Sequence, residues 1–359
     1  MNARDKVAVH YTRCPVPTAT GIGLAKRMFD ALYADTIYRF RDIAELGPAG
    51  ADAHYTHSID YFFREGGGAP ALWARARGAD SRLLGITFME ELLGIYVRAD
   101  DAVSSVADLA GRRIALPVWP SLVFDFWRFA AEKGFHSALA RHGLRDADVE
   151  RVDVVENPGS NKKRNGGNRG GNPGELVYGY RRQQEALLLH RVDAIFGKGA
   201  EASVLEREAG GRIRLLYDLR GSPDIGDRVN NSTPRLVTTS ARLMHDHPEA
   251  VIRYLQGILR AARWAPRHPE DAANIIAREC GIAPPDVARC FQPNYAGRLV
   301  PAITPELLGT VEVMKSFLLG RGYLAGDFDL LNWVDAAPLE AATRREDAAA
   351  SLGDAVAPR

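Results

Sequence analysis

Strand-like segments alternate with helical segments along this chain, and the alternation limits its fold more than any other feature. Runs of β-branched, aromatic and other apolar residues predict strands, and they lie at residues 6–11, 83–86, 93–97, 113–116, 152–155 and 235–240. Apolar residues at helical spacing predict helices after two of these strands, at residues 19–33 and around 124–131. Strands that alternate with helices favour parallel βαβ units. The sequence therefore predicts an α/β fold.

The length of the chain predicts two domains. Its 359 residues exceed the roughly 250 to 300 residues at which a single core stops growing. Proline opens two further predicted helices late in the chain, from Pro248 through Trp264 and from Pro269 through Cys280. From about residue 341 onward, Ala, Asp and Arg are frequent and apolar periodicity is lost, so we expect a loosely attached tail there.

Composition and charge exclude several classes of protein. With 46% hydrophobic and 25% charged residues, the chain has the profile of a soluble globular protein. Lys and Arg number 46 against 45 Asp and Glu, so no long-range positive field is available to hold nucleic acid. No uncharged run reaches the ~18 residues of a membrane span, and the first residues carry no apolar stretch of signal-peptide length. We therefore expect a cytoplasmic protein without nucleic-acid or membrane partners, and we favour a monomer.

Residues 157–174 read NPGSNKKRNGGNRGGNPG, with six Gly, five Asn, four cations and no acid. Such a segment cannot bury enough apolar area to order itself, which predicts a mobile loop. A solvated linker is the commoner role for this composition. An electropositive lid over an anionic substrate is the alternative, because the loop interrupts a folded region.

Cys14 is the first residue that points to chemistry. It ends the first predicted strand, and the helix after Pro15 and Pro17 begins close by. Ligands of α/β sheets collect at the carboxyl ends of strands, and a helix N-terminus favours a thiolate. A small buried side chain is the commoner fate of a lone cysteine, and we expect that fate for Cys280 and Cys290. The three cysteines match neither a disulfide framework nor a C-x-x-C metal site, which indicates a reducing compartment.

The segment HYTHSIDYFFREGGGAPALW, from His54 to Trp73, predicts an anion pocket. The backbone of its three glycines, residues 66–68, can approach a ligand closely, and the following helix directs its positive end to the same place. Arg64 offers a planar fork of donors that suits the two oxygens of a sulfinate or carboxylate. A plain turn and a solvated arginine are the alternatives. His54 and His57 lack companion ligands at metal spacing, so we expect no metal.

Three longer segments resemble two-domain solute-binding proteins of the sulfonate and pyrimidine-precursor type. They are YVRADDAVSSVADLAGRRIALP, RRQQEALLLHRVDAIF and HPEAVIRYLQGILRAARWAPRHPEDAANIIAREC, and the resemblance extends to about residue 335. It implies a type II periplasmic-binding-protein-like fold, with two α/β domains and a ligand cleft between them. The implied division is residues 1–97 plus 234–335 for the first domain, 98–233 for the second and 336–359 for a C-terminal tail.

A narrower resemblance rests on C-P-V-P at residues 14–17, His54-Tyr55-Thr56, and Arg64-x-Gly66-Gly67. In order and spacing these motifs are similar to those of the 2'-hydroxybiphenyl-2-sulfinate desulfinase family, whose members are cytoplasmic enzymes on the same fold. The resemblance implies an arylsulfinate desulfinase, which cleaves an aromatic C–S bond and releases sulfite without a cofactor. The implied catalytic residues are Cys14, His54 and Arg64, and the implied backbone donor is Gly67.

The remaining substrate contacts implied by this resemblance are Thr12, Tyr55 and Trp127. Thr12 stands where the family has serine and Tyr55 where it has phenylalanine, which leaves the exact substrate open. Trp127 belongs to an aromatic run for which core packing is the commoner role. Cys14 acts either as a nucleophile on sulfur or as a proton donor to the ring carbon. The alternative function is a solute-binding protein for a sulfonate or aromatic anion, and pyrimidine-precursor synthesis is disfavoured because the cysteine-rich motif it requires is absent.

Overall fold

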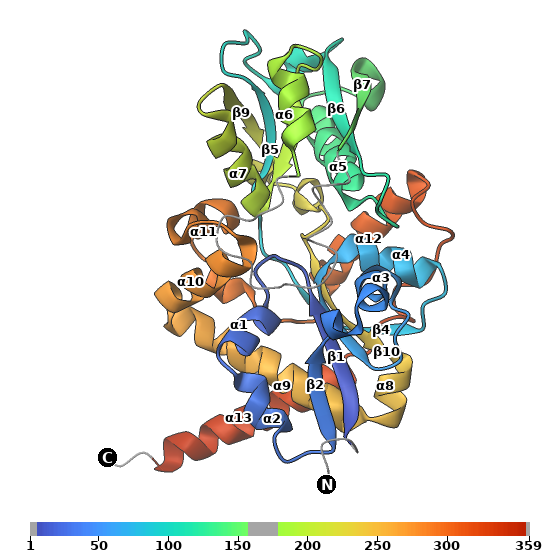
Figure 1. Cartoon of the computed structure of the whole chain (residues 1–359), viewed down its shortest axis with the longest axis vertical. Helices are drawn as coiled ribbons and strands as arrows, with labels where there is room; N and C mark the ends of the chain where they lie inside the picture. Colours follow the sequence, from blue (N-terminus) through green and yellow to red (C-terminus); the bar gives the residue numbers. More distant parts are fainter. Residues whose placement is uncertain (1–5, 157–178, 357–359) are drawn as a thin grey trace.

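The computed structural model describes residues 6–156 and 179–356, so the predicted loop at 157–174 lies outside the described residues. The described chain forms two lobes, one below the other in Figure 1. The first lobe is built on a five-stranded sheet of order β2-β1-β3-β10-β4. Its strands are β1 (Val7–Arg13), β2 (Tyr38–Asp42), β3 (Phe62–Gly67), β4 (Ser81–Thr87) and β10 (Arg235–Ser240).

Strand direction in this sheet sets the position of the functional residues. β1 runs parallel to β2 and β3, as the alternation of strands and helices predicts. β10 runs antiparallel between β3 and β4. The carboxyl ends of β1 and β3 therefore meet the amino end of β10 at one edge of the sheet.

Helices cover both faces of this sheet. One face packs on α1 (Ala19–Ala25), α2 (Met28–Tyr33), α9 (Pro248–Trp264), α10 (Pro269–Cys280) and α11 (Pro284–Phe291). The other face packs on α4 (Gly68–Ala76) and α12 (Pro305–Gly320), with α3 (Pro48–Thr56) beside α4 and α8 (Ala241–Asp246) following β10. Burial from both sides explains why every residue of β3 and β10 is buried.

The prediction of one helix over residues 19–33 is wrong. The segment forms α1 and α2 because Arg27 adopts a left-handed backbone conformation with φ of 57°. The two predicted helices at 248–264 and 269–280 are confirmed with their proline starts.

The second lobe contains two smaller sheets. The three-stranded sheet has the order β8-β5-β9 and is antiparallel, with β5 (Leu93–Arg98), β8 (Ile195–Lys198) and β9 (Ile213–Asp218). β6 (Arg113–Val118) and β7 (Glu150–Val155) pair in parallel. The helices of this lobe are α5 (Phe126–Arg141), α6 (Arg181–Leu188) and α7 (Gly199–Ala209).

The chain crosses between the lobes twice, after β4 and after β9 (Figure 1). The first sheet accordingly draws its strands from two distant parts of the sequence, and the described fold is mixed α/β. The exact domain boundaries given above stay a prediction, which this strand membership supports.

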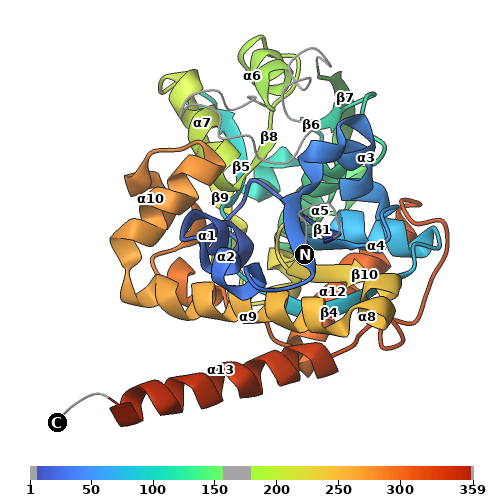
Figure 2. The same ribbon diagram turned by 60° about the horizontal axis from the view of Figure 1, so that its bottom comes forward.

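The expectation of a loosely attached tail is wrong for the described C-terminal residues. They form α13 (Ala337–Val356), which lies along α9 (Figure 2). The Glu346 carboxylate accepts a hydrogen bond from Gln256 Nε2 at 2.7 Å and from Arg260 Nε at 2.8 Å. These polar contacts attach α13 to α9, so the helix does not need a strong apolar stripe to pack there. Among the described helices, none combines the length and the apolar character that a membrane crossing requires.

We expect Glu346→Ala to lower the free energy of unfolding by about 1 to 3 kcal/mol, because it leaves two half-buried donors without their acceptor. Urea unfolding measures this change. The neighbouring Asp347→Ala is the matched control, since Asp347 pairs with Arg263 at the surface and such pairs contribute about 0 to 1 kcal/mol. Equal effects of the two substitutions would contradict the assigned role of Glu346.

Candidate active site

Cys14 directly follows β1 and lies beside the end of β3. Its backbone N–H donates to Glu65 O at 3.1 Å, which continues the pairing of the two strands. The thiol approaches position 66 so closely that an ideal Cβ there would lie 2.3 Å from Cys14 Sγ. Glycine is therefore required at position 66. The sequence analysis predicts that the backbone of the glycine run approaches a ligand closely, and in the structure Gly66 lies close to the Cys14 thiol.

The structure brings the three predicted catalytic side chains together. Cys14 Sγ lies 3.6 Å from His54 Nε2. Arg64 Nη2 donates to the same sulfur at 3.7 Å, and Arg64 Nε donates to His54 O at 3.1 Å. Residues of three elements thus converge: Cys14 after β1, His54 on α3 and Arg64 on β3.

Thr12 fixes the orientation of the imidazole. Its Oγ1 lies 2.7 Å from His54 Nδ1, which directs Nε2 to the thiol. Burial and the charge of Arg64 lower the pKa of His54 well below its ordinary value, so the ring is neutral near pH 7. A neutral imidazole carries its proton on either Nδ1 or Nε2. Which nitrogen carries it depends on the hydrogen bonds to Thr12 at Nδ1 and to Cys14 at Nε2.

Arg64 is a buried cation without a carboxylate partner among the residues that the structure describes. Its side chain is 0% exposed, and its Nη1 has no hydrogen-bond partner in the described structure. No ion pair forms between Arg64 and an acid within residues 6–156 and 179–356. An unpaired buried guanidinium is costly, and an anion with two oxygens satisfies its free donors.

The predicted effect of a helix N-terminus on Cys14 is wrong, because another group occupies that N-terminus. The Glu65 carboxylate accepts from Ala19 N at 3.1 Å and from Thr20 N at 2.7 Å, the first amides of α1. Successive residues of a strand point to opposite faces, so Glu65 reaches α1 while Arg64 faces His54. The environment of Cys14 is therefore set by His54 and Arg64.

Tyr55 and Trp127 belong to one line of aromatic rings. Tyr55 lies edge-on to His54, with ring centroids 4.9 Å apart, and is stacked on Phe126 at 6.3 Å. Phe126 in turn lies 5.3 Å from Trp127. Trp127 is 3% exposed and packs against further rings, so its packing role is established and its contact with substrate stays a prediction.

The structure leaves Gly67 no room for a side chain, because an ideal Cβ there would lie 2.6 Å from Asn231 O. Its assignment as a backbone donor stays a prediction. Cys280 and Cys290 are buried in the core as expected, and burial raises the pKa of Cys290 to about 12. Across the described residues, no group of His, Cys, Asp or Glu side chains could hold a metal ion, and His57 caps α3.

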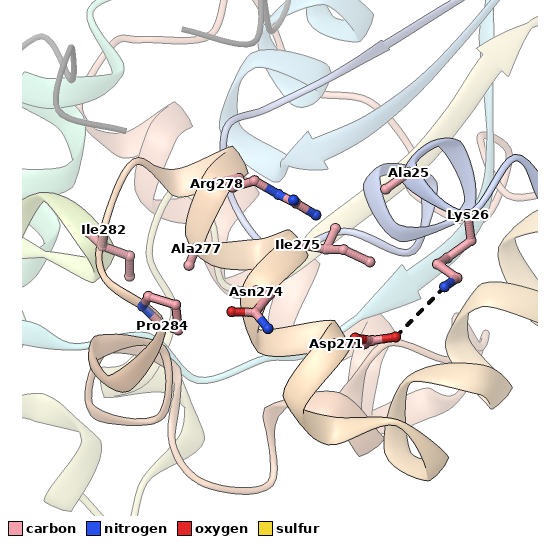
Figure 3. Close-up of a pocket in the computed structure, with 9 residues that line it drawn as sticks. All are labelled: Ala25, Lys26, Asp271, Asn274, Ile275, Ala277, Arg278, Ile282 and Pro284. Carbon is pink, nitrogen blue, oxygen red and sulfur yellow. Dashed lines mark ion pairs between the residues drawn. The ribbon is translucent and has the colours of Figure 1, made fainter. Parts of the chain in front are cut away.

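Two further charged residues, Arg235 and Glu91, were not predicted from the sequence and lie buried where the two crossovers meet the first sheet. A charged residue at the start of the apolar segment RLVTTS was the available signal for Arg235. A separate pocket of about 430 Å³ (Figure 3) contains none of the residues discussed so far. It lies between α1 and α10, and its charged groups Lys26 and Asp271 already pair at 3.7 Å.

The chain is similar in sequence to known desulfinases. It is 27% identical over 348 residues to the 2'-hydroxybiphenyl-2-sulfinate desulfinases of Rhodococcus erythropolis and Rhodococcus qingshengii, with 90% of each chain covered. No family model matches it.

Solved structures show the same fold. The desulfurization enzyme DSZB superimposes with a TM-score of 0.75 at 23% identity, covering 95% of this chain and all of the other. A DSZB mutant in complex with biphenyl-2-sulfinic acid superimposes with a TM-score of 0.74 at 24% identity, covering 95% of this chain and 99% of the other. The periplasmic aliphatic sulphonate binding protein SsuA from Escherichia coli superimposes with a TM-score of 0.62 at 14% identity, covering 91% of this chain and 92% of the other. The fold is thus periplasmic-binding-protein-like, and the resemblance of the sequence to 2'-hydroxybiphenyl-2-sulfinate desulfinases is confirmed over nine-tenths of the chain.

Proposed function

We propose that this protein is an arylsulfinate desulfinase. It converts an aryl sulfinate and water into the arene and sulfite, by hydrolysis of the aromatic C–S bond and without a cofactor. The observation that carries the proposal is the buried Arg64, which has a free donor and lies 3.7 Å from the Cys14 thiol. The desulfinase activity for which the similar Rhodococcus proteins are named and the biphenyl-2-sulfinic acid bound to the DSZB mutant support this substrate class.

In the proposed reaction, Arg64 and the backbone N–H of Gly67 bind the sulfinate oxygens. These donors stabilise the negative charge that develops on the sulfur group as its bond to carbon breaks. The neutral His54 exchanges a proton with Cys14, and Thr12 keeps its ring in position. Tyr55 and Trp127 are the proposed contacts for the aryl rings.

Two routes for Cys14 balance the reaction. In the first, the thiolate attacks sulfur, the aryl carbon takes a proton as its C–S bond breaks, and water hydrolyses the S–S bond to release hydrogen sulfite. In the second, the thiol protonates the ring carbon, sulfur dioxide leaves, and water converts it to hydrogen sulfite. Mass spectrometry of Cys14 distinguishes them, because only the first route forms a covalent adduct on this residue.

A solute-binding protein for a sulfonate or aromatic anion is the alternative function, since sulphonate-binding proteins share the fold. The similarity to the desulfinase structures is higher, with TM-scores of 0.74 and 0.75 against 0.62 and 0.68 for two SsuA proteins. Tight binding of an arylsulfinate without sulfite release would select the binding protein. The cytoplasmic location stays a prediction.

We expect Cys14→Ser to lower the rate of sulfite release by about 100-fold or more, because a hydroxyl is a weaker acid and nucleophile than a thiol. A colorimetric sulfite assay with 2'-hydroxybiphenyl-2-sulfinate measures the rate. Cys280→Ala is the control, and it keeps the rate because Cys280 lies in the core. Full turnover by the Cys14→Ser variant would end the proposal.

We expect Gly66→Ala to lower kcat by about 10 to 100-fold, because the added methyl group displaces the thiol from His54 and Arg64. Gly68→Ala is the matched control in the same segment. Its new methyl group would meet the flexible Met314 side chain, which can shift, at 3.0 Å from Sδ, and Pro234 O at the milder distance of 3.3 Å, whereas an alanine at position 66 meets the thiol at 2.3 Å. Wild-type kcat in the Gly66→Ala variant would show that the position of the thiol is unimportant.

The pH dependence of kcat/KM tests the charge of His54. Because its pKa lies well below 6.5 in the folded protein, kcat/KM should show no inflection near pH 6.5, and any loss from His54 protonation should come at lower pH. The free energy of unfolding should fall as the pH drops below about 6.5, since unfolded His54 then binds a proton that folded His54 does not. An inflection of kcat/KM near pH 6.5 would contradict a neutral ring.

A further inference from the structure

A second arginine at the same sheet edge is buried without hydrogen bonds. Arg235 is the first residue of β10 and is 1% exposed. Its Nε, Nη1 and Nη2 all lack a hydrogen-bond partner among the described residues, and its guanidinium lies over the ring of Phe291, 5.9 Å from the ring centroid. Burial lowers the pKa of Arg235, yet a guanidinium keeps its charge in proteins. Five donors therefore have no acceptor.

Glu91 is a buried acceptor near these donors, because the next residue, Leu92, donates its N–H to Cys290 O at 2.7 Å and the ring of Phe291 lies beside the Arg235 guanidinium. Glu91 is 1% exposed, and its carboxylate oxygens make no hydrogen bond within 3.5 Å in the described chain. Lys198 Nζ lies 3.9 Å from Oε1, and the Ser232 hydroxyl is also near this carboxylate. Glu91 is the strongest favourable charge acting on Arg235, and the two do not form a direct ion pair in the described structure. A group placed between them could bond to both.

Asn231 adds a third unsatisfied polar atom. Its side chain is 6% exposed, and its Oδ1 has no partner within the described residues. It lies 3.1 Å from an ideal Cβ of Gly67, and Gly67 is the residue paired with Arg235 across the two strands. Buried polar groups in native structures are nearly always satisfied. Three at one place therefore indicate a bound polar group.

The mixture of donors and acceptors selects the chemistry of that group. The carboxylate of Glu91 disfavours an anion, and the guanidinium of Arg235 disfavours a cation. A hydroxyl group satisfies both, because it accepts from Arg235 and donates to Glu91 or to Asn231. We propose that Arg235 and Glu91 bind a hydroxyl group of the aryl substrate.

The position of Arg235 fits a substrate with two rings. Arg64 pairs with Thr238 on β10, so Arg235 points to the opposite face of the sheet at the same edge. Gly66, against which the Cys14 thiol packs, pairs with Leu236, the residue that follows Arg235, so the thiol and Arg235 lie near the same end of β10. In the proposed complex, a two-ring substrate lies across this edge of the first sheet. The sulfinate on one ring binds Arg64, and the hydroxyl group on the other ring binds Arg235. This inference rests on the proposed function for the sulfinate end alone.

Calorimetry with two ligands tests the proposal. The ligand 2-hydroxybiphenyl carries only the hydroxyl group, and biphenyl-2-sulfinate carries only the sulfinate. We expect Arg235→Met to weaken binding of 2-hydroxybiphenyl by about 10-fold or more and to leave the affinity for biphenyl-2-sulfinate unchanged. Arg82→Met, on β4 with its Asp80 pair at the surface, is the control and changes neither affinity.

Three results would overturn the proposal: no binding of 2-hydroxybiphenyl to the wild type, equal weakening of both ligands, or no weakening of either. Thermal unfolding supplies a second measurement. If Arg235 serves only the fold, Arg235→Met lowers the Tm of the free protein. If it serves a ligand, the Tm is unchanged or raised, because an unpaired buried charge has been removed.

Glu91→Gln gives an independent variant with the shape of the site retained. We expect it to weaken the binding of 2-hydroxybiphenyl and to leave the affinity for biphenyl-2-sulfinate unchanged. An unchanged affinity for 2-hydroxybiphenyl would contradict the role of Glu91. The sulfite assay stays separate from these measurements. Selective loss of phenol binding in a protein that releases no sulfite would retain the hydroxyl site and reject the desulfinase.

Discussion

The unpaired charge of Arg64 is the constraint around which the first lobe is arranged. A guanidinium with no exposed surface destabilises a fold when it has no carboxylate partner, and Arg64 has none within residues 6–156 and 179–356. The bonds to His54 O and Cys14 Sγ offset this cost only in part. The same bonds fix the three proposed catalytic groups relative to one another. In the proposed complex, the cost in stability of the free protein is also the source of affinity, since a bound sulfinate would supply the missing acceptors.

The sheet makes this arrangement possible through the alternation of its side chains. On β3, Arg64 faces α3 and the thiol, whereas the next residue, Glu65, faces the opposite way and satisfies the first amides of α1. Gly66 then leaves the space that the Cys14 sulfur fills. Three consecutive residues thus place the cation, keep a carboxylate away from it, and leave room for the thiol. A carboxylate on the Arg64 face would neutralise the guanidinium and exclude the proposed anionic substrate.

Much of this site could be predicted from the sequence, because its residues follow strand ends in short, recognisable motifs. Cys14, His54 and Arg64 converge as expected, and the buried state of Cys280 and Cys290 also follows from their helical context. Properties that depend on distant contacts could not be predicted. The break after α1 requires the left-handed backbone of Arg27, and the docking of α13 depends on Glu346 reaching residues of α9. The N-terminus of α1 goes to Glu65, which is some 45 residues away along the chain.

The same fold serves sulphonate-binding proteins, so the question is what converts anion binding into bond cleavage. Binding the sulfinate oxygens equally well before and during the reaction would lower KM without raising kcat. In the proposed reaction Cys14 changes this, because its sulfur lies 3.6 Å from a neutral imidazole with which it can exchange a proton as the C–S bond breaks. Arg64 contacts the thiol and, in the proposed complex, also the sulfinate. Charge that shifts between these two sulfur atoms would therefore stay beside the guanidinium, which would stabilise it most where that charge is most developed.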